Sequence, residues 1–138
     1  MKHINNARKL RKLLTELATE SEDKTLAIAC KDFFPPWAPG AYSVGDIRTN
    51  PETGCPAECI LAHDSTVNTD WTITTATLWK PYHSRKKAYA LPWQHSAGAH
   101  DIYKTGEFMI WTDCRIYRCK SDTQFSPAEY SAAWELAE

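Results

Sequence analysis

From Trp37 onward the chain carries one sequence pattern written twice, and this internal repeat limits the fold more than any other feature. Each copy has a Tyr-x-x-Gly segment followed by an acidic and an apolar residue, then a short run that ends in Cys, and later a Trp. The matching positions are Tyr42 and Tyr103, Gly45 and Gly106, Cys59 and Cys119, and Trp79 and Trp134. A tandem pattern of this kind predicts two structural units of the same design.

Both copies have the composition of small antiparallel β-sheets. Short runs of β-branched and aromatic residues alternate with Gly, Pro, Asn and Asp, which favour turns. Gly tolerates the positive φ of a tight turn, so the apolar residue after the acid is expected to point into a small core. Because each copy has only about 45 residues, we expect the copies to pack on each other or on the preceding segment.

The N-terminal segment is expected to be helical. Its apolar residues follow the 3-4-3 spacing of a heptad seam, which predicts an amphipathic helix over residues 4–19. The seam consists of Ala7, Leu10, Leu14 and Leu17. Such a helix is too short for a stable coiled coil by itself, but it is long enough to pair subunits that also touch elsewhere. We therefore predict that the seam mediates homo-oligomerisation or docking.

Further signals divide the chain. Ser21, a capping residue followed by acids, predicts a second short helix, which Pro35 and Pro36 end. The expected fold class is therefore α+β, mainly small antiparallel β, with an N-terminal helical region followed by two small three-stranded modules. The expected divisions are a helical oligomerisation or docking region at 1–34, a first module at 35–82, a linker at 83–92 and a second module at 93–138.

Charge and hydropathy exclude several partners. The formal net charge is −1 and 24% of the residues are charged, so no bulk attraction to nucleic acid is expected. The cluster of Lys and Arg in the first half of the N-terminal helix is interpreted as a solvated face rather than a membrane-surface or nucleic-acid helix. The chain shows neither a run of about 20 apolar residues nor a secretion signal, so we expect synthesis in a cytoplasm and no membrane partner.

The five cysteines are expected to be free thiols, because the number is odd and no secretion signal is seen. Local pairs, Cys55 with Cys59 and Cys114 with Cys119, are the alternative that the spacing leaves open. Cys55, Cys59 and His63 recur at intervals of four residues. This spacing is not that of a zinc ribbon or knuckle, so neither a metal nor a cofactor is expected.

Catalysis is not expected either. General acid–base or nucleophilic catalysis needs side chains that converge on one point. His63-Asp64-Ser65 and His100-Asp101 contain suitable residue types, but neighbours on a strand point to opposite faces of a sheet. Two minimal modules also offer little scaffold for the paired carboxylates of glycoside hydrolysis. We therefore predict a protein without enzymatic activity.

Aromatic residues are abundant, since six Trp, six Tyr and four Phe make up 12% of the chain. Such rings can fill a small core or stack on the apolar face of a sugar ring, and the sequence leaves both roles open for each of them. Stacking of this kind gives single-module affinities in the micromolar to millimolar range. The candidate carbohydrate-binding residues are Trp37, Tyr42, Trp71, Trp79, Trp93, Tyr103, Phe125 and Trp134.

The order of these residues resembles a known family. In both copies a Trp, the Tyr-x-x-Gly-acid turn, a strand ending in Cys and a final Trp follow one another as in the small family 5/12-like chitin-binding modules of bacterial chitinases. The layout, with Phe33-Phe34-Pro35-Pro36-Trp37 after a helix and Pro92-Trp93 before the second copy, is similar to carbohydrate-binding proteins encoded beside tail-fibre genes of phages and prophages. Both copies lack the Ala-Lys-Trp-Trp-Thr-Gln-like stretch of chitinase modules, so the resemblance implies a glycan rather than chitin itself.

The resemblance implies a non-catalytic accessory protein of a phage tail that binds a bacterial surface polysaccharide or another glycan through exposed aromatic residues. The implied partners are that glycan, further copies of the chain and tail-fibre proteins. The alternative is a structural connector of a tail or fibre without affinity for sugars. A coplanar pair of exposed rings favours glycan binding, whereas joint burial of Trp37, Trp79 and Trp134 favours the connector.

Overall fold

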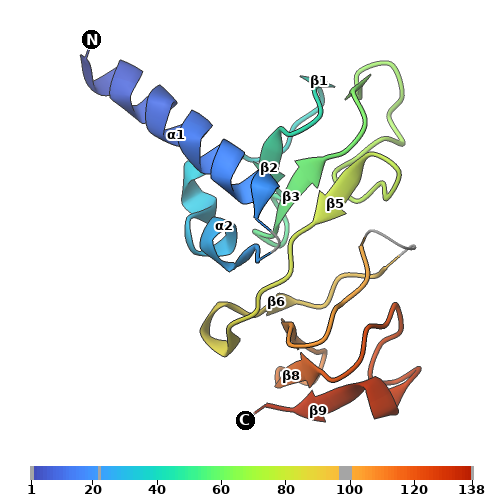
Figure 1. Cartoon of the computed structure of the whole chain (residues 1–138). Coiled ribbons are helices and arrows are strands. Elements are labelled where there is room, and N and C mark those ends of the chain that lie inside the picture. The colour runs from blue at the N-terminus through green and yellow to red at the C-terminus, as the bar shows by residue number, and fades with distance from the viewer. Residues whose placement is uncertain (1, 22, 97–100, 138) are drawn as a thin grey trace.

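The computed structural model describes residues 2–21, 23–96 and 101–137, with side chains of the first helix described from Arg8 onward. A long helix, α1 (Lys2–Glu20), is followed by the short helix α2 (Thr25–Ala29) and the 3-10 turn η1 (Lys31–Phe33). Two β units follow along the chain, and Figure 1 shows them one above the other, with α1 and α2 beside the upper unit. The expected α+β class, with an N-terminal helix and mainly small antiparallel sheets, is confirmed.

Each unit is built on a small sheet. The first unit has a three-stranded antiparallel sheet in the order β2 (Ile47–Thr49), β3 (Pro56–Cys59), β5 (Trp79–Pro81). A separate ladder in this unit pairs β1 (Ala41–Tyr42) with β4 (His63–Asp64). The second unit has the order β6 (Leu91–Pro92), β7 (Phe108–Ile110), β8 (Ile116–Cys119), β9 (Trp134–Leu136). In this second sheet β6 adds a parallel strand to a three-stranded antiparallel core.

The tight turn before each sheet is held by the same backbone hydrogen bonds in both units. Gly45 N–H donates to Cys59 O at 2.9 Å, and Gly106 N–H donates to Cys119 O at 2.9 Å. Both glycines have positive φ, 95° and 92°, which residues with a side chain rarely adopt. In each unit the Cys then pairs in register with the Trp that closes the sheet. The two copies of the pattern thus form equivalent turns and ladders.

The segment before each turn also has the same geometry in both units. Trp37 N–H donates to Thr49 O at 2.8 Å, and Trp93 N–H donates to Ile110 O at 2.9 Å. One residue further on, a backbone N–H donates to the hydroxyl of the turn tyrosine, at 3.2 Å in the first unit and 3.0 Å in the second. Each unit therefore consists of a leading Trp, a turn and three antiparallel strands.

We expect Gly45→Ala and Gly106→Ala each to lower the free energy of unfolding by about 1–2 kcal/mol. A Cβ at either position would meet no atom within 4 Å, so the effect comes from the backbone conformation alone. Urea unfolding of the two variants measures it. The matched control is Gly40→Ala, where φ is not positive and the nearest atom is 3.9 Å away. A loss at Gly40 as large as at the two turns would contradict the prediction.

Three apolar clusters hold the molecule together. One of them joins the helices to the first sheet and contains Ala18, Ile28 and Ile47. The other two lie inside the units, one around Trp79 and one around Trp134. Burial of these side chains removes apolar surface from water and stabilises each unit. The helical region is therefore packed onto the first unit rather than separated from it.

Lys24 ties the end of α1 to the first sheet. Its ammonium Nζ donates to Ala18 O at 2.5 Å and to Thr19 O at 3.4 Å, so it satisfies carbonyls of the last helical turn. The same Nζ lies 4.0 Å from Glu58 Oε1 and 5.0 Å from the ring centre of Tyr82. Burial lowers the pKa of Lys24, and the neighbouring carboxylate opposes this shift. The direction of α1 is thereby fixed relative to β3.

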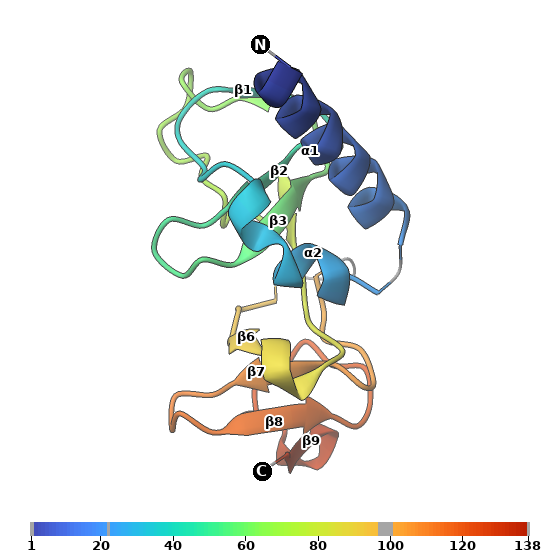
Figure 2. The same cartoon turned by 90° about the vertical axis from the view of Figure 1, so that its left-hand side faces the viewer.

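Residues 83–92, which the sequence suggested as a linker, lie within the second unit. Leu91–Pro92 form β6, and Ser84 makes a β-bridge with Phe108. The N–H of Arg85 donates at 2.9 Å to a hydroxyl of α2. In Figure 2 the segment, with the 3-10 turn η2, lies between α2 and the second sheet. These backbone groups thus form hydrogen bonds with protein, whereas the backbone groups of an open linker would form them with water.

Candidate functional site

A cavity of about 270 Å³ lies between the two units, where β5 faces the residues that follow β6. Its walls include one Trp from each unit, Trp79 and Trp93. Polar side chains also line it, namely Asn50, Thr53, Thr74, Gln94, His95 and Asp101. We call this cavity the inter-module pocket. It combines aromatic surface with hydrogen-bonding groups, as small-ligand sites do.

The Trp93 ring is fixed at the pocket by two further rings. Tyr103 and His83 stack with their centroids 3.7 Å apart and their planes 4° apart, and Trp93 stacks on Tyr103 at 5.0 Å and 12°. Two parallel rings this close to one tyrosine lie on its opposite faces, so Tyr103 is the middle layer. Tyr103 is only 1% exposed, and the N–H of Gln94 donates to its hydroxyl at 3.0 Å. Burial also raises the pKa of Tyr103.

A buried acid supports this stack. His83 Nδ1 lies 3.4 Å from Glu107 Oε1, and both side chains are buried. The same oxygen accepts a hydrogen bond of 2.6 Å from Lys104 N–H, so Glu107 closes the turn and positions the imidazole. No local sequence pattern points to His83, because Tyr103 and Glu107 lie far from it along the chain.

Trp79 forms the opposite wall of the pocket and is almost completely covered by its own unit, with 1% of its surface exposed. It packs edge-to-face on Tyr42 at 5.0 Å and on His63 at 5.8 Å. Its Nε1 has no hydrogen-bond partner among the described residues. Trp79 therefore limits the size of the pocket but does not present a free face to it.

The structure divides the eight candidate aromatic residues into three groups. The buried ones are Trp79, Tyr103 and Trp134. The half-buried ones are Trp37, Tyr42, Trp71 and Trp93. Phe125 alone is exposed, at 44%. A unit with three short strands needs large rings to fill its centre. The three buried residues therefore belong to the core and offer no exposed face for stacking on a sugar.

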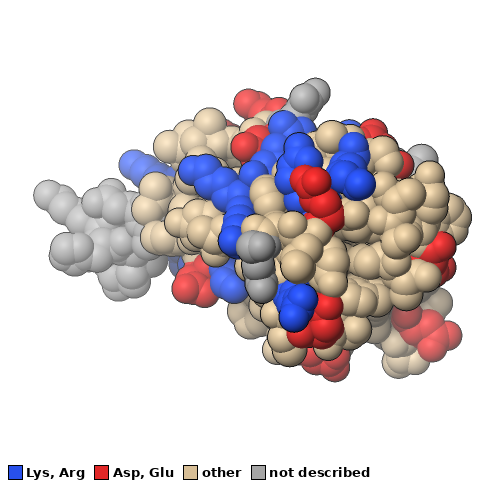
Figure 3. Space-filling model, turned by 90° about the horizontal axis from the view of Figure 1, so that it is seen from below, with Lys and Arg blue, Asp and Glu red and all other residues tan. Residues whose placement is uncertain are grey.

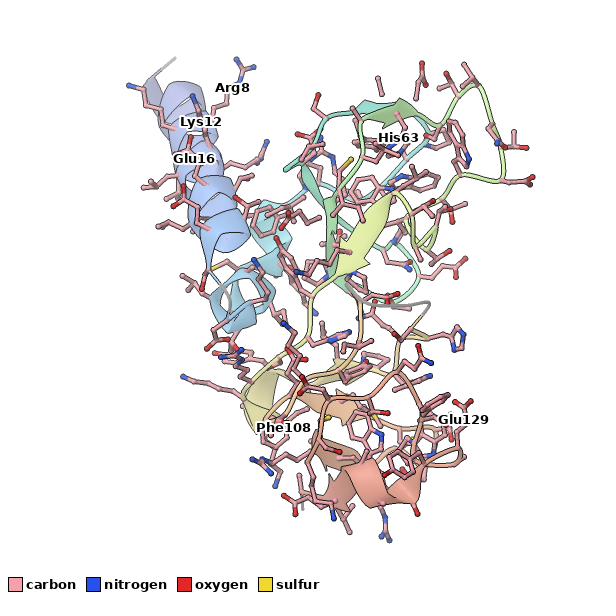
Figure 4. The ribbon with its side chains drawn as sticks, turned by 45° about the vertical axis from the view of Figure 1, so that its right-hand side comes forward. Arg8, Lys12, Glu16, His63, Phe108 and Glu129 are labelled. Carbon is pink, nitrogen blue, oxygen red and sulfur yellow. The ribbon has the colours of Figure 1, made fainter. Side chains whose placement is uncertain are left out.

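The structure contains neither a coplanar pair of two exposed rings, which would favour glycan binding, nor three fully buried Trp residues, which would favour a connector, among the described residues. Among the described residues, the parallel pair Trp93–Tyr103 has one buried member, and the ring pairs around His63 are tilted or edge-to-face. Two of the three Trp residues that would indicate a connector are buried, but Trp37 is only half-buried. Phe125 lines an open hollow together with Glu129, which Figure 4 labels in the lower unit. The inter-module pocket is therefore the strongest candidate site.

The five cysteines are not paired in disulfides. All five are free thiols. Cys59 Sγ lies 3.8 Å from His63 Nδ1, but within the described ranges no group of three or more His, Cys, Asp or Glu side chains could hold a metal ion. Burial raises the pKa of Cys55 and Cys59, and that of Cys119 to about 11. These thiols stay protonated near neutral pH and are poor ligands and nucleophiles.

The side chains of His63, Asp64 and Ser65 do not converge on one point. His63 and Asp64 bond within their own loop, to Leu61 O and to Thr66, whereas the Ser65 hydroxyl donates to Gly40 O before β1. The hydrogen bonds from Thr66 lower the pKa of Asp64. His100 lies outside the described residues. The His63 segment therefore gives no triad geometry.

The predicted seam of α1 does not form one continuous surface. Leu10 and Leu17 are exposed, at 44% and 47%, but Leu14 packs against the core that joins the helices to the sheet. Leu13, which the seam omitted, is 52% exposed. The side chain of Ala7 lies outside the described residues. The uncovered stripe is therefore Leu10, Leu13 and Leu17.

Charged residues of both signs share the face seen from below in Figure 3, where Lys and Arg side chains alternate with Asp and Glu. This face thus has no field of a single sign that would select a strongly charged polymer.

None of the helices in the described part of the chain is both long and apolar enough to cross a membrane.

No protein family model matches the chain, and no curated protein sequence matches it. Its function is therefore inferred from the inter-module pocket and from the surface of α1.

Proposed function

We propose that the protein is a non-catalytic glycan-binding protein and that the inter-module pocket is its binding site. The observation that carries the proposal is the presence of Trp93 in the pocket wall, held in a three-ring stack and surrounded by amide, hydroxyl and imidazole side chains. The apolar face of a pyranose stacks on such a ring, while its hydroxyl groups need polar partners around the rim. Asn50, Gln94 and His95 are suited to that second role.

The volume of the pocket limits the size of the ligand that it can hold. Its volume of about 270 Å³ lies just below the ~300 Å³ at which typical ligand sites begin. A pocket of this size suits one sugar unit, such as a chain end or a side branch of a bacterial surface polysaccharide. One stacked ring and a few hydrogen bonds give affinities between about 1 μM and 1 mM.

We expect Trp93→Ala to weaken glycan binding at least about ten-fold, which corresponds to about 1.4 kcal/mol, and His95→Ala to weaken it several-fold. Trp93→Ala removes the stacking surface, whereas His95→Ala removes a rim contact at an exposed position and leaves the fold unchanged. The measurement is an array of bacterial surface polysaccharides, chitin and cellulose, followed by calorimetric titration of any glycan that binds.

Phe125→Ala is the matched control, because Phe125 is the exposed candidate ring that does not line the pocket. It should bind as the wild-type protein does. Absence of wild-type binding to every polysaccharide would contradict the proposal. Loss of binding in Phe125→Ala, with Trp93→Ala and His95→Ala unaffected, would place the site elsewhere.

We also propose that the protein works on a phage tail, as the sequence resemblance implies. Mass spectrometry of purified phage particles should detect the chain in the tail fraction. Its absence from purified particles that retain their fibres would contradict this location.

A second candidate function is the structural connector, which is favoured by the burial of Trp79 and Trp134 and by the uncovered leucines of α1. Deletion of the gene separates the two functions. Particles without a glycan-binding protein should assemble normally but adsorb poorly to cells. Particles without a connector should have incomplete tails.

A further inference from the structure

Helix α1 carries an apolar stripe that its own chain leaves uncovered. Leu10, Leu13 and Leu17 are exposed, at 44%, 52% and 47%, and follow one another at intervals of three and four residues. Residues at this spacing share one side of a helix. The adjacent side of α1, with Leu14 and Ala18, holds the helix against the body. The stripe therefore lies outside the core cluster that fixes α1 to its own chain.

The stripe borders an apolar depression. A small cavity of about 40 Å³ lies between α1 and α2, and Leu17 and Leu26 are among its lining residues. Leu26 is itself 58% exposed. The apolar surface thus continues from α1 across the depression to α2. An incoming leucine side chain would find apolar contacts on both helices.

The charges of α1 indicate what covers this stripe. Arg8, Lys9 and Lys12 are exposed in its first half, and Glu16 and Glu20 are exposed in its second half. Figure 4 shows Arg8 and Lys12 toward the free end of the helix and Glu16 closer to the sheets. A second α1 in antiparallel orientation would bring the basic half of each helix beside the acidic half of the other. A parallel orientation would align like charges.

The positions of individual charges fit the same orientation. Lys9 and Glu16 are seven residues apart and flank the stripe on the same edge. In an antiparallel pair centred near Leu13, Leu10 of one copy lies beside Leu17 of the other. Lys9 then lies beside Glu16 of the second copy, and two-fold symmetry forms this contact twice.

We infer that α1 joins two copies of this chain into an antiparallel homodimer through Leu10, Leu13 and Leu17, flanked by Lys9–Glu16 contacts between the copies. A helix of this length with exposed leucines gains from burial of that stripe. The interface leaves the inter-module pocket free, since no residue of α1 lines it. Two pockets per dimer would bind a polysaccharide with avidity. The dimer itself does not depend on glycan binding.

Sedimentation velocity of the full chain tests the inference. The wild-type protein should sediment at twice the 15.7 kDa mass of the chain, at micromolar concentration. Leu13→Glu should be monomeric and fully folded, because Leu13 makes no core contact in its own chain. Leu61→Glu is the matched control, as Leu61 is a similarly exposed leucine, 54%, outside the helices. It should remain dimeric.

A charge exchange tests the orientation. Lys9→Glu and Glu16→Lys should each weaken the dimer about ten-fold, because each places like charges side by side. The double variant Lys9→Glu with Glu16→Lys should restore wild-type affinity. A wild-type protein that is monomeric up to millimolar concentration would overturn the inference. A dimer that Leu13→Glu leaves intact, or a double variant weaker than both single ones, would overturn it as well.

Discussion

Replacing Trp79 or Trp134 with alanine is expected to lower the free energy of unfolding by about 3–5 kcal/mol. Both rings are buried, at 1% and 5% exposure, and each lies in register opposite the Cys of its own unit. Each meets the turn tyrosine edge-on, at 5.0 Å in the first unit and 5.3 Å in the second. A loss of this size is a large part of the about 7–20 kcal/mol expected for 138 residues.

Chemical denaturation of both variants measures this effect. Phe125→Ala is the control, and its unfolding free energy should change by no more than about 0.5 kcal/mol because the ring is exposed. The variants Trp79→Phe and Trp134→Phe separate the effect of lost packing from the effect of a lost indole hydrogen bond. Trp134 Nε1 donates to Phe125 O at 2.9 Å, whereas Trp79 Nε1 has no partner in the described chain. Trp134→Phe should therefore cost more than Trp79→Phe, and the reverse order would contradict the assignment.

Raising the pH from 8 to 11 is expected to lower the free energy of unfolding by roughly 5 kcal/mol. Burial raises the pKa of Tyr82 and Tyr103 above the ordinary value of 10.0, and raises that of Cys119 from 9.0 to about 11. Below their ordinary pKa values these groups are protonated in both states and have no effect on stability. Above them the unfolded chain loses protons that the folded chain retains.

Each such group lowers the free energy of unfolding by about 1.4 kcal/mol per pH unit once the pH exceeds its unfolded pKa. For Cys119 the loss stops growing near pH 11, where the folded thiol also ionises. Denaturation midpoints at pH 8, 9.5 and 11, measured with reductant present, give the slope.

Tyr82→Phe isolates one contributor. The variant keeps the ring but loses the hydroxyl, which donates to Glu58 Oε1 at 2.7 Å. Loss of that hydrogen bond lowers stability by about 1 kcal/mol at neutral pH. Above pH 10 the slope should be shallower than that of the wild-type protein by about 1.4 kcal/mol per pH unit. A midpoint independent of pH between 8 and 11 would contradict the role of burial.

The repeat made much of the fold predictable, because its key positions are set by local backbone geometry. Gly45 and Gly106 occur where the chain needs positive φ, and the spacing from each glycine to its Cys fixes which backbone groups meet. The same rules do not say whether the residues between the two copies form a flexible linker or belong to one of the sheets. Residues 83–92 have a polar, Lys- and Arg-rich composition typical of a linker, yet a β-bridge and β6 hold them in the second unit.

The side of helix α1 that packs on the first unit is a second feature that the sequence alone does not predict. The spacing of its apolar residues predicts one seam through Leu10, Leu14 and Leu17, and periodicity alone does not say which of these residues faces the body. Only the position of the sheet decides that Leu14 is covered and Leu13 is not.

The candidate site was the least predictable part. Trp93 was among the aromatic candidates, but no sequence pattern indicated a glycan-binding role for Gln94, His95 or Asn50. They come together only because the two units pack against each other with β5 near the residues after β6. A pocket between units depends on long-range packing, which no local motif encodes.

The layered arrangement of His83, Tyr103 and Trp93 has a thermodynamic consequence for ligand capture. A free indole side chain loses rotamer entropy when it is immobilised against a ligand, and that loss subtracts from affinity. Here folding has already packed Trp93 against Tyr103 as the outer ring of the stack. The incoming sugar therefore meets a preorganised surface, so even a shallow pocket retains most of its contact energy as net affinity.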